Sequence, residues 1–213
     1  MFAAQKNRGK QFYWLLLTGF SLTIGAVGQG TFIYDQQSAV EGTLGEGGGA
    51  IQSSQPFGQS FTPSLSSINF IRLWLADAFP GNSLGASVYI NLRSNSITGP
   101  IMASTDPVFM ADGFGVANRE YANFFFSTEI AVTPGMTYFF QPVVGAGGDT
   151  WVAGGDTRYN YTGGTLIFQG VAKPFSDLWF REGILVVPEP SSLALLLLGS
   201  GVLFYVRRAK HRR

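Results

Sequence analysis

Short runs of β-branched and aromatic residues, bounded by Gly, Pro, Asn and Asp, recur through the middle of the chain. Residues 68–75 are almost continuously apolar, while Val88, Ile90 and Leu92 alternate with more polar neighbours, as expected for a half-buried strand. Residues 29–187 show no helical periodicity of useful length. The pattern therefore predicts a domain built from strands.

Further stretches of the same character bring the expected total to eight to ten strands. They are residues 31–34, 59–62, 101–104, 121–126, 136–144, 151–153, 165–169 and 178–181. Thr133-Pro134-Gly135-Met136 has the Pro-Gly pair of a type II turn, because Gly accepts a positive φ at the third position, and should join two strands. Residues 41–49, with five glycines in nine, are expected to be a flexible loop or linker. This spacing predicts an all-β fold, a β-sandwich spanning residues 29–187.

The amino-terminal segment is basic and then apolar. Lys6, Arg8 and Lys10 precede an apolar run over residues 12–27 that only small or hydroxyl residues interrupt. This is the pattern of a signal peptide, expected at residues 1–28. The alternative is an uncleaved anchor helix, which the pattern favours less because the run is shorter than the ~20 residues that span a bilayer.

The carboxy-terminal segment combines three features in order. Pro188-Glu189-Pro190 comes first, and its prolines fix φ and remove backbone donors, so the triplet should stay extended and accessible. Residues 191–206 follow as an apolar stretch, about 24 Å long as a helix. The basic residues that close the chain are Arg207, Arg208, Lys210, Arg212 and Arg213. By the positive-inside rule this end should lie in the cytoplasm and the domain before it outside.

Together, the triplet, the short glycine-containing apolar stretch and the arginine cluster resemble the PEP-CTERM sorting signal of Gram-negative bacteria that make exopolysaccharide. The resemblance assigns residues 188–213 to this signal. It implies transient anchoring in the inner membrane, processing near the triplet by an exosortase-like membrane enzyme, and release or transfer to the cell surface. An ordinary membrane anchor that is never cut is the alternative.

Composition removes several classes of function. The chain has no cysteine, which excludes disulfides, thiol nucleophiles and thiolate metal sites. Its only histidine, His211, lies among the terminal arginines, so the predicted domain has no imidazole for catalysis. Residues 29–187 hold 6 of the 14 Lys and Arg but 12 of the 13 Asp and Glu, which leaves a net charge of about −6. Such a domain should repel nucleic acid.

A short repeat is a weak candidate for calcium binding. Gly147-Gly148-Asp149-Thr150 recurs as Gly154-Gly155-Asp156-Thr157. Asp149 and Asp156 beside glycines could supply oxygen ligands to a cation, and the acidic domain would favour one. Paired glycines before Asp are also typical of tight turns, and we favour turns over a metal site here.

Aromatic residues supply a second candidate site. Trp151, Tyr159 and Tyr161 cluster in the second half of the domain, and exposed aromatic rings can stack on the apolar faces of sugars. Core packing is the alternative, and it is favoured for Trp74 and Trp179, whose neighbours on both sides are apolar. Tyr159 and Tyr161 alternate with polar residues and are better candidates for display.

Two regions of the domain resemble the jelly-roll modules common in exported bacterial proteins. Gln59-Ser60-Phe61-Thr62-Pro63 leads into an apolar strand, and Tyr161-Thr162-Gly163-Gly164 precedes Asp177-Leu178-Trp179-Phe180-Arg181. Such modules are similar to carbohydrate-binding domains. The resemblance implies a jelly-roll-like sandwich, but it marks closing strands rather than any binding residue.

The sequence thus favours a non-enzymatic exported surface or matrix protein with a structural or adhesive role in association with exopolysaccharide. A carbohydrate-binding module that reads the glycan directly is the alternative. A glycoside hydrolase is favoured less, because nothing in the spacing of the carboxylates singles out a catalytic pair. In addition, no carboxylate stands in an apolar sequence setting that would raise its pKa for acid catalysis.

Overall fold

The computed structural model describes residues 30–39, 47–116, 120–159, 161–187 and 208. The predicted signal peptide, the Pro188-Glu189-Pro190 triplet and the apolar stretch 191–206 lie outside these residues, as does the basic tail apart from the exposed Arg208. No helix within the described ranges is long and apolar enough to cross a membrane.

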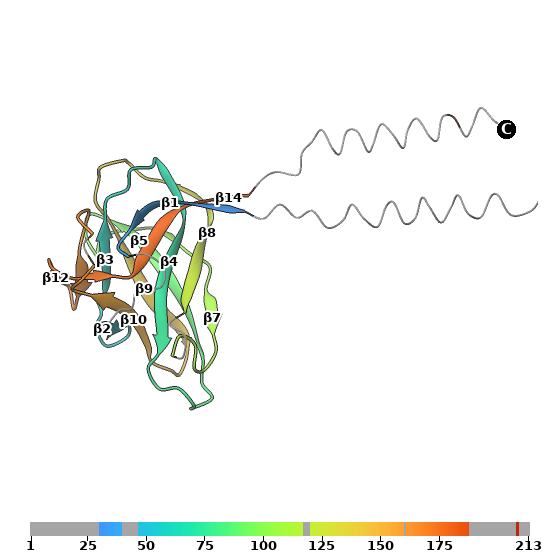
Figure 1. Cartoon of the computed structure of the whole chain (residues 1–213), viewed down its shortest axis with the longest axis vertical. Coiled ribbons are helices and arrows are strands. Elements are labelled where there is room, and N and C mark those ends of the chain that lie inside the picture. The colour runs from blue at the N-terminus through green and yellow to red at the C-terminus, as the bar shows by residue number, and fades with distance from the viewer. Residues whose placement is uncertain (1–29, 40–46, 117–119, 160, 188–207, 209–213) are drawn as a thin grey trace, which may run out of the picture. The chain divides into compact units, whose positions relative to one another are not determined.

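The described strands form two sheets (Figure 1). The first sheet contains β1 (Thr31–Gln37), β2 (Gly47–Ala50), β4 (Ser67–Asp77), β8 (Tyr121–Ala131), β10 (Trp151–Asp156), β13 (Asp177–Leu178) and β14 (Phe180–Val186). The second contains β3 (Gly58–Phe61), β5 (Ala86–Ser94), β6 (Ile101–Ser104), β7 (Val108–Met110), β9 (Tyr138–Gly147), β11 (Leu166–Phe168) and β12 (Val171–Lys173). Each stretch that the sequence predicts to be a strand overlaps one of these elements.

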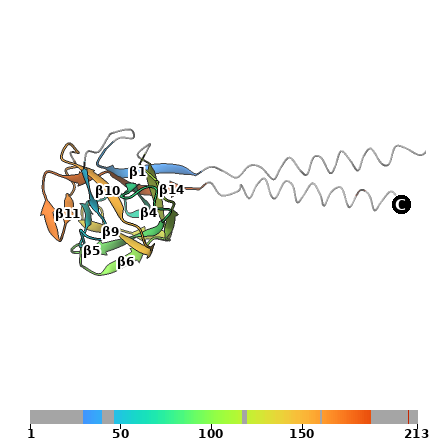
Figure 2. The ribbon, with the colours of Figure 1, turned by 90° about the horizontal axis from the view of Figure 1, so that it is seen from below.

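The two sheets lie in separate layers, with β1, β10 and β14 of the first above β5, β6 and β9 of the second in Figure 2. The first sheet runs β1-β14-β4-β10-β13, with β2 added to β10 and β8 added to β4. The second runs β12-β11-β3-β9-β5-β6, with β7 added to β5. The predicted all-β fold is confirmed, and two antiparallel sheets agree with the predicted sandwich. The closer likeness to jelly rolls stays a prediction.

Strand β4 separates an inner face from an outer one. Ile71, Leu73 and Leu75 pack in the core between the sheets, and the intervening Arg72 and Trp74 lie on the other face, because successive side chains of a strand point to opposite sides. The large residues that share this core include Phe57, Phe61, Phe124, Phe140, Trp151 and Phe180, which come from both sheets and from the segment before β3. In β5, Val88, Ile90 and Leu92 are fully buried, so the inward face predicted for this strand is confirmed.

The turn between β8 and β9 is the predicted type II turn. Gly135 has a φ of 79°, and the N–H of Met136 donates to the carbonyl of Thr133 at 3.1 Å. The ring of Pro134 fixes the φ that the second position of the turn needs, and Gly135 takes the positive φ of the third position without steric cost. The short link lets β8 pair with β4 in one sheet while β9 pairs with β5 in the other.

The loop predicted at residues 41–49 is wrong for its last three residues, which begin strand β2. Gly48 pairs with Gly154 of β10. A Cβ on Gly48 would lie 2.6 Å from the carbonyl oxygen of Ala153, and one on Gly49 would lie 2.5 Å from the ring of Phe57. Glycine is therefore needed for close packing here, and tertiary contact overrides the low strand propensity of the segment. The short strands β7 and β12 were not predicted either.

Strands β1 and β14 bring the two ends of the folded unit together. The N–H of Ser38 donates to the carbonyl of Phe180 at 3.1 Å, and Gly183 lies against Ile33 further along the same pair. Residue numbers rise along β14 as those of the contacting residues fall along β1, so the two strands run antiparallel. The start of β1 and the end of β14 therefore meet at one end of the sheet, as Figure 1 shows.

Gly183 tests this pairing. A Cβ at this position would lie 2.0 Å from the carbonyl oxygen of Ile33, and the φ of 151° is itself unfavourable for other residues. We expect Gly183→Ala to lower the free energy of unfolding by about 1–3 kcal/mol, measured by urea denaturation. Gly148→Ala is the control, since its Cβ would meet nothing closer than Leu84 at 3.8 Å. Equal midpoints for both variants would contradict the close contact of β1 with β14.

Candidate functional site

The three aromatic residues proposed from the sequence as glycan contacts are buried. Trp151 is 0% exposed and packs against Phe114, with ring centroids 6.1 Å apart. Tyr161 is 8% exposed, and its hydroxyl accepts a hydrogen bond from the N–H of Thr62 at 2.9 Å. Burial raises the pKa of Tyr161 to about 12. Tyr159 is 5% exposed and packs in a small second core.

The expectation that Tyr159 and Tyr161 are displayed is therefore wrong. That expectation assumed that the alternation of aromatic and polar residues marks a strand with one exposed face. In the structure β10 ends at Asp156, and Thr157 and Arg158 form a turn. The two-residue period does not separate inside from outside in a turn, so the alternation carried no information about exposure.

The two aspartates of the glycine repeat lie at opposite ends of β10, about 20 Å apart along the strand. Asp149 accepts hydrogen bonds from the side chain of Asn82 and from the N–H of Thr150. Asp156 is bound by the guanidinium and the N–H of Arg158. The structure does not bring them together as ligands of one ion. In the described ranges, no group of three or more His, Cys, Asp or Glu could hold a metal.

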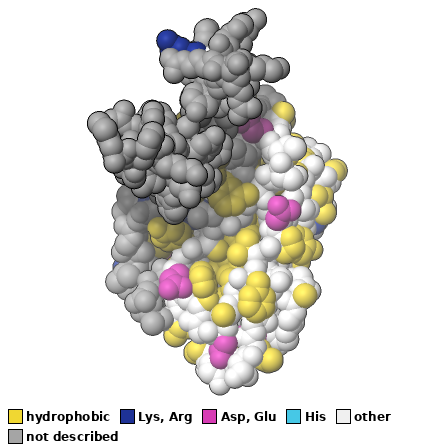
Figure 3. Space-filling view, turned by 90° about the vertical axis from the view of Figure 1, so that its right-hand side faces the viewer, with side chains coloured by type: hydrophobic (Ala, Val, Ile, Leu, Met, Phe, Trp, Pro, Cys, Tyr) yellow, Lys and Arg dark blue, Asp and Glu magenta, His cyan; other side chains and the backbone are white. Residues whose placement is uncertain are grey.

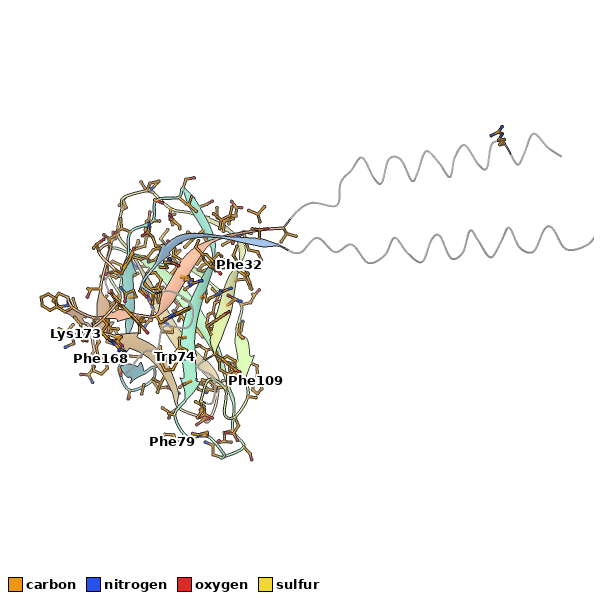
Figure 4. The ribbon with its side chains drawn as sticks, in the orientation of Figure 1. Phe32, Trp74, Phe79, Phe109, Phe168 and Lys173 are labelled. Carbon is orange, nitrogen blue, oxygen red and sulfur yellow. The ribbon has the colours of Figure 1, made fainter. Side chains whose placement is uncertain are left out.

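A different set of aromatic residues lines the face of the first sheet that points away from the core. We call it the outer aromatic face. It comprises Phe32, Tyr34, Phe70, Arg72, Trp74, Tyr121, Asn123, Phe125, Trp179 and Arg181. Phe32 and Trp74, both labelled in Figure 4, lie towards its two ends along the strands. These residues come from four strands and from the junction before β14, so only the sheet assembles them.

Strand register sets the rows of this face. Tyr121, Asn123 and Phe125 of β8 lie opposite Trp74, Arg72 and Phe70 of β4, respectively. On the other side of β4, Arg181 of β14 lies opposite Arg72. Cross-strand neighbours on one face lie close enough for their side chains to touch. The result is a central row of polar and cationic groups between two rows of rings.

Arg72 is held between aromatic rings. Its guanidinium carbon lies 4.7 Å from the ring centroid of Phe32 and 4.5 Å from that of Tyr121, within the range of cation–π attraction. Its Nε donates to Oδ1 of Asn123 at 2.6 Å, and its Nη1 donates to the hydroxyl of Tyr34 at 2.7 Å. These contacts fix the positions of rings from β1 and β8 around one cation.

Arg181 repeats the arrangement one strand away. Its guanidinium carbon lies 4.7 Å from the ring centroid of Tyr34 and 5.4 Å from that of Trp179. Trp179 in turn stacks on Tyr121, with centroids 5.6 Å apart and planes only 9° from parallel. Directly opposed like charges destabilise a sheet, so the pairing of Arg72 with Arg181 is not what stability alone would favour. Such a costly feature is more often found where a surface binds something.

Three rings of the outer aromatic face are well exposed. Tyr121 is 41% exposed, and Tyr34 and Phe125 are each 36% exposed. Tyr121 and Phe125 are about 13 Å apart along β8. Figure 3 views the side on which β7 and β8 lie in Figure 1, where hydrophobic side chains gather between isolated acidic ones. Arg72 and Arg181 are only 5% and 7% exposed, so they hold the rings in place from beneath. The exposed rings can stack on apolar ring faces, and the tyrosine hydroxyls and the half-buried Asn123 amide can hydrogen-bond to ligand hydroxyls.

Sequence reasoning missed this face for a physical reason. Residues 121–126 are almost entirely apolar or aromatic, so their pattern does not tell which side of β8 faces water. One signal was present, because Arg72 interrupts the apolar run at 68–75. A cation inside such a run marks the side of the strand that is not the core.

The remaining assignment concerns the carboxy-terminal segment. The family profile of the PEP-CTERM protein-sorting motif matches residues 186–213. This chain carries a PEP-CTERM sorting motif. It is therefore an exported protein that is sorted through the membrane and processed by an exosortase, a membrane enzyme. A search of the curated proteins finds no match to the chain.

The PEP-CTERM motif begins where the sheet ends. Strand β14 extends to Val186, the first residue of the motif, and only Val187 separates it from Pro188. Before this point β14 is paired with β4 from Phe180 to Gly183. In the sequence, the last strand of the folded domain thus ends two residues before Pro188.

The same strand carries a buried carboxyl group. Glu182 is 0% exposed and lies among core residues on the inner side of β14. Burial raises the pKa of Glu182 to about 9, and the nearby Asp35 carboxyl adds to the rise. The sequence suggested that no carboxylate has an apolar setting, and that expectation is wrong. The setting arises from strands β1 and β4 on either side of β14, which are distant in the chain.

Glu182 predicts a pH dependence of stability. The folded chain keeps this proton up to about pH 9, whereas the unfolded chain releases it near pH 4.5. Between these values the folded state binds one more proton, so the free energy of unfolding falls as pH rises. The stability that the protonated Glu182 contributes is complete below about pH 4.5 and is lost once the pH passes about 9. We expect Glu182→Gln to flatten the fall of the urea midpoint from about pH 5 to about pH 9.

The exposed Glu120 provides the control for this series. Glu120→Gln makes the same chemical change at a position that folding leaves exposed to water. It should therefore leave the slope of the urea midpoint against pH as it is in the unmodified chain. The same slope in Glu182→Gln and Glu120→Gln would show that Glu182 is not the group responsible.

Proposed function

We propose that this chain is a non-enzymatic surface or matrix protein that binds extracellular polysaccharide through its outer aromatic face. The sorting motif places it among exported proteins. The single observation that carries the binding role is the set of rings assembled around Arg72, of which Tyr34 and Tyr121 are exposed. The role is adhesive: the protein links the envelope or matrix to the glycan around it.

Sorting precedes binding in this proposal. The basic residues after residue 206 hold the carboxy terminus in the cytoplasm while the domain lies outside. The exosortase acts near Pro188-Glu189-Pro190, and the domain then passes to the cell surface or matrix. Because β14 ends at Val186, cleavage at the triplet leaves the sheet complete.

Binding of a glycan suits the outer aromatic face better than binding of another protein or a nucleic acid. Sugar rings have apolar faces that stack on Tyr and Phe, and hydroxyls that hydrogen-bond to the tyrosine hydroxyls and the Asn123 amide of this face. The rings and guanidiniums are held by each other, so little side-chain freedom is lost on binding. The acidic charge of the domain disfavours nucleic acid.

A non-enzymatic role is supported by the position of Glu182. A glycosidase needs a carboxyl group of raised pKa that reaches the scissile bond. Glu182 has the raised pKa but is fully buried, beneath the sheet rather than on the outer aromatic face. It cannot protonate a glycosidic oxygen in this conformation.

The sorting step is tested by intact-mass analysis of the protein recovered from its host. We expect a mass that lacks the signal peptide and the residues after the triplet. Replacing Pro188, Glu189 and Pro190 by Ala should leave residues 191–213 attached and retain the protein in the membrane fraction. A recovered mass equal to the full 213 residues would overturn the processing step.

The binding step is tested by retention on the host's own extracellular polysaccharide in affinity electrophoresis. Tyr121→Ala and Phe125→Ala should each weaken binding by about 1–2 kcal/mol, or about 5- to 30-fold. Phe79→Ala is the matched control, because Phe79 is an exposed ring outside this face (Figure 4). Equal loss in all three variants, or no loss in any, would contradict the assignment, provided that urea midpoints show each variant to be folded.

A further inference from the structure

A cavity of about 370 Å³ opens between the edges of the two sheets, away from the outer aromatic face. Its lining residues are Gly47, Gly48, Gly49, Gly155, Asp156, Thr157, Arg158, Leu166, Phe168, Ser176 and Leu178. Strands β2 and β10 supply one wall and β11 supplies another. The volume lies within the range of small-molecule sites.

The cavity exists because strand β2 has no side chains to fill it. Alternate residues of a strand share a face, so Gly47 and Gly49 face the same side. A Cβ on Gly49 would meet Phe57 and Phe168, which places that side towards the space between the sheets. Among the residues that the structure describes, a Cβ on Gly47 would meet only the carbonyl oxygen of Gly155, at 3.4 Å. Gly47 therefore lines the cavity without filling it by any described contact.

The walls differ in chemistry. Leu166, Phe168 and Leu178 form an apolar side, and Phe168 is held edge-on against Phe57 with centroids 6.2 Å apart. The polar side has the hydroxyls of Thr157 and Ser176 and an ion pair. The three glycines of β2 contribute only backbone groups to the lining.

The ion pair is a fixed hydrogen-bonding edge. Both oxygens of Asp156 accept from Nε of Arg158, at 3.0 and 2.9 Å, and its second oxygen also binds the Arg158 Nη2. The Asp156 side chain is almost fully buried, whereas that of Arg158 is 56% exposed. The buried carboxylate therefore orients the guanidinium of Arg158, which lines the cavity and can also donate to an oxygen-rich ligand.

We infer that this cavity binds one saccharide ring, such as a terminal or branching unit of a glycan. A sugar ring has an apolar face for Phe168 and hydroxyls for Arg158, Thr157 and Ser176. An acyl chain would desolvate the ion pair without replacing its hydrogen bonds, and a small inorganic ion would leave the apolar wall unused. The inference builds on the proposed polysaccharide binding, but its residues lie on β2, β10 and β11 rather than on the outer aromatic face.

The experiment uses the full chain in detergent and saturation-transfer difference NMR. The probes are the neutral mono- and disaccharides released by acid hydrolysis of the host's extracellular polysaccharide, each at millimolar concentration. We expect at least one probe to show transfer that is strongest at the protons of its apolar face. Gly47→Val should abolish the signal by filling the cavity, with Gly148→Val as the control glycine in the β9–β10 loop.

Ser176→Ala guards against misfolding, because it removes one hydroxyl and leaves the backbone bonds of the site in place. It should weaken the bound saccharide about tenfold. The inference is overturned if no probe binds, or if binding persists unchanged in both Gly47→Val and Ser176→Ala. If Tyr121→Ala loses polymer retention but no saccharide binds in the cavity, the proposed function is supported and the cavity site is not. Saccharide binding in the cavity together with full polymer retention in Tyr121→Ala would support the cavity site and contradict polymer binding by the outer aromatic face.

Discussion

The antiparallel register between β4 and β14 sets both faces of the first sheet. It places Arg181 beside Arg72 on the outer side and Glu182 beside Ile71 towards the core. Outside, two cations are held among the rings of Phe32, Tyr34 and Trp179. Inside, a carboxyl group keeps its proton because water is excluded. A shift of one residue would exchange these two sets of side chains and destroy both.

The same sheet also connects binding to sorting. Strand β14 bears Arg181 near its start and reaches the sorting motif at its end, and β1 lies beside it. The proposed glycan contacts therefore lie on a sheet whose strand β14 is followed directly in the sequence by the sorting motif. With a second, smaller site at the β2 edge, one polymer could be held at two places, which raises the avidity of weak contacts.

Much of the fold follows from local pattern. The alternation in β5 and the Pro-Gly pair between β8 and β9 predict an inward face and a turn that the structure contains. Strand β2 could not be predicted, because three consecutive glycines have no strand propensity and form a strand only when β10 pairs with them. Tyr159 and Tyr161 were misplaced because the turn after Asp156 removed the two-residue period on which their expected exposure depended.

The sorting motif could be recognised from the order of residues. A Pro-Glu-Pro triplet, an apolar stretch and a basic end form one linear segment that needs no partner from elsewhere in the chain. The outer aromatic face and the cavity were decided only by tertiary structure. Their residues come from strands far apart in sequence. In addition, when a strand such as β8 carries apolar residues on both faces, its sequence does not indicate which face is exposed to water. That choice is made when the second sheet covers one side.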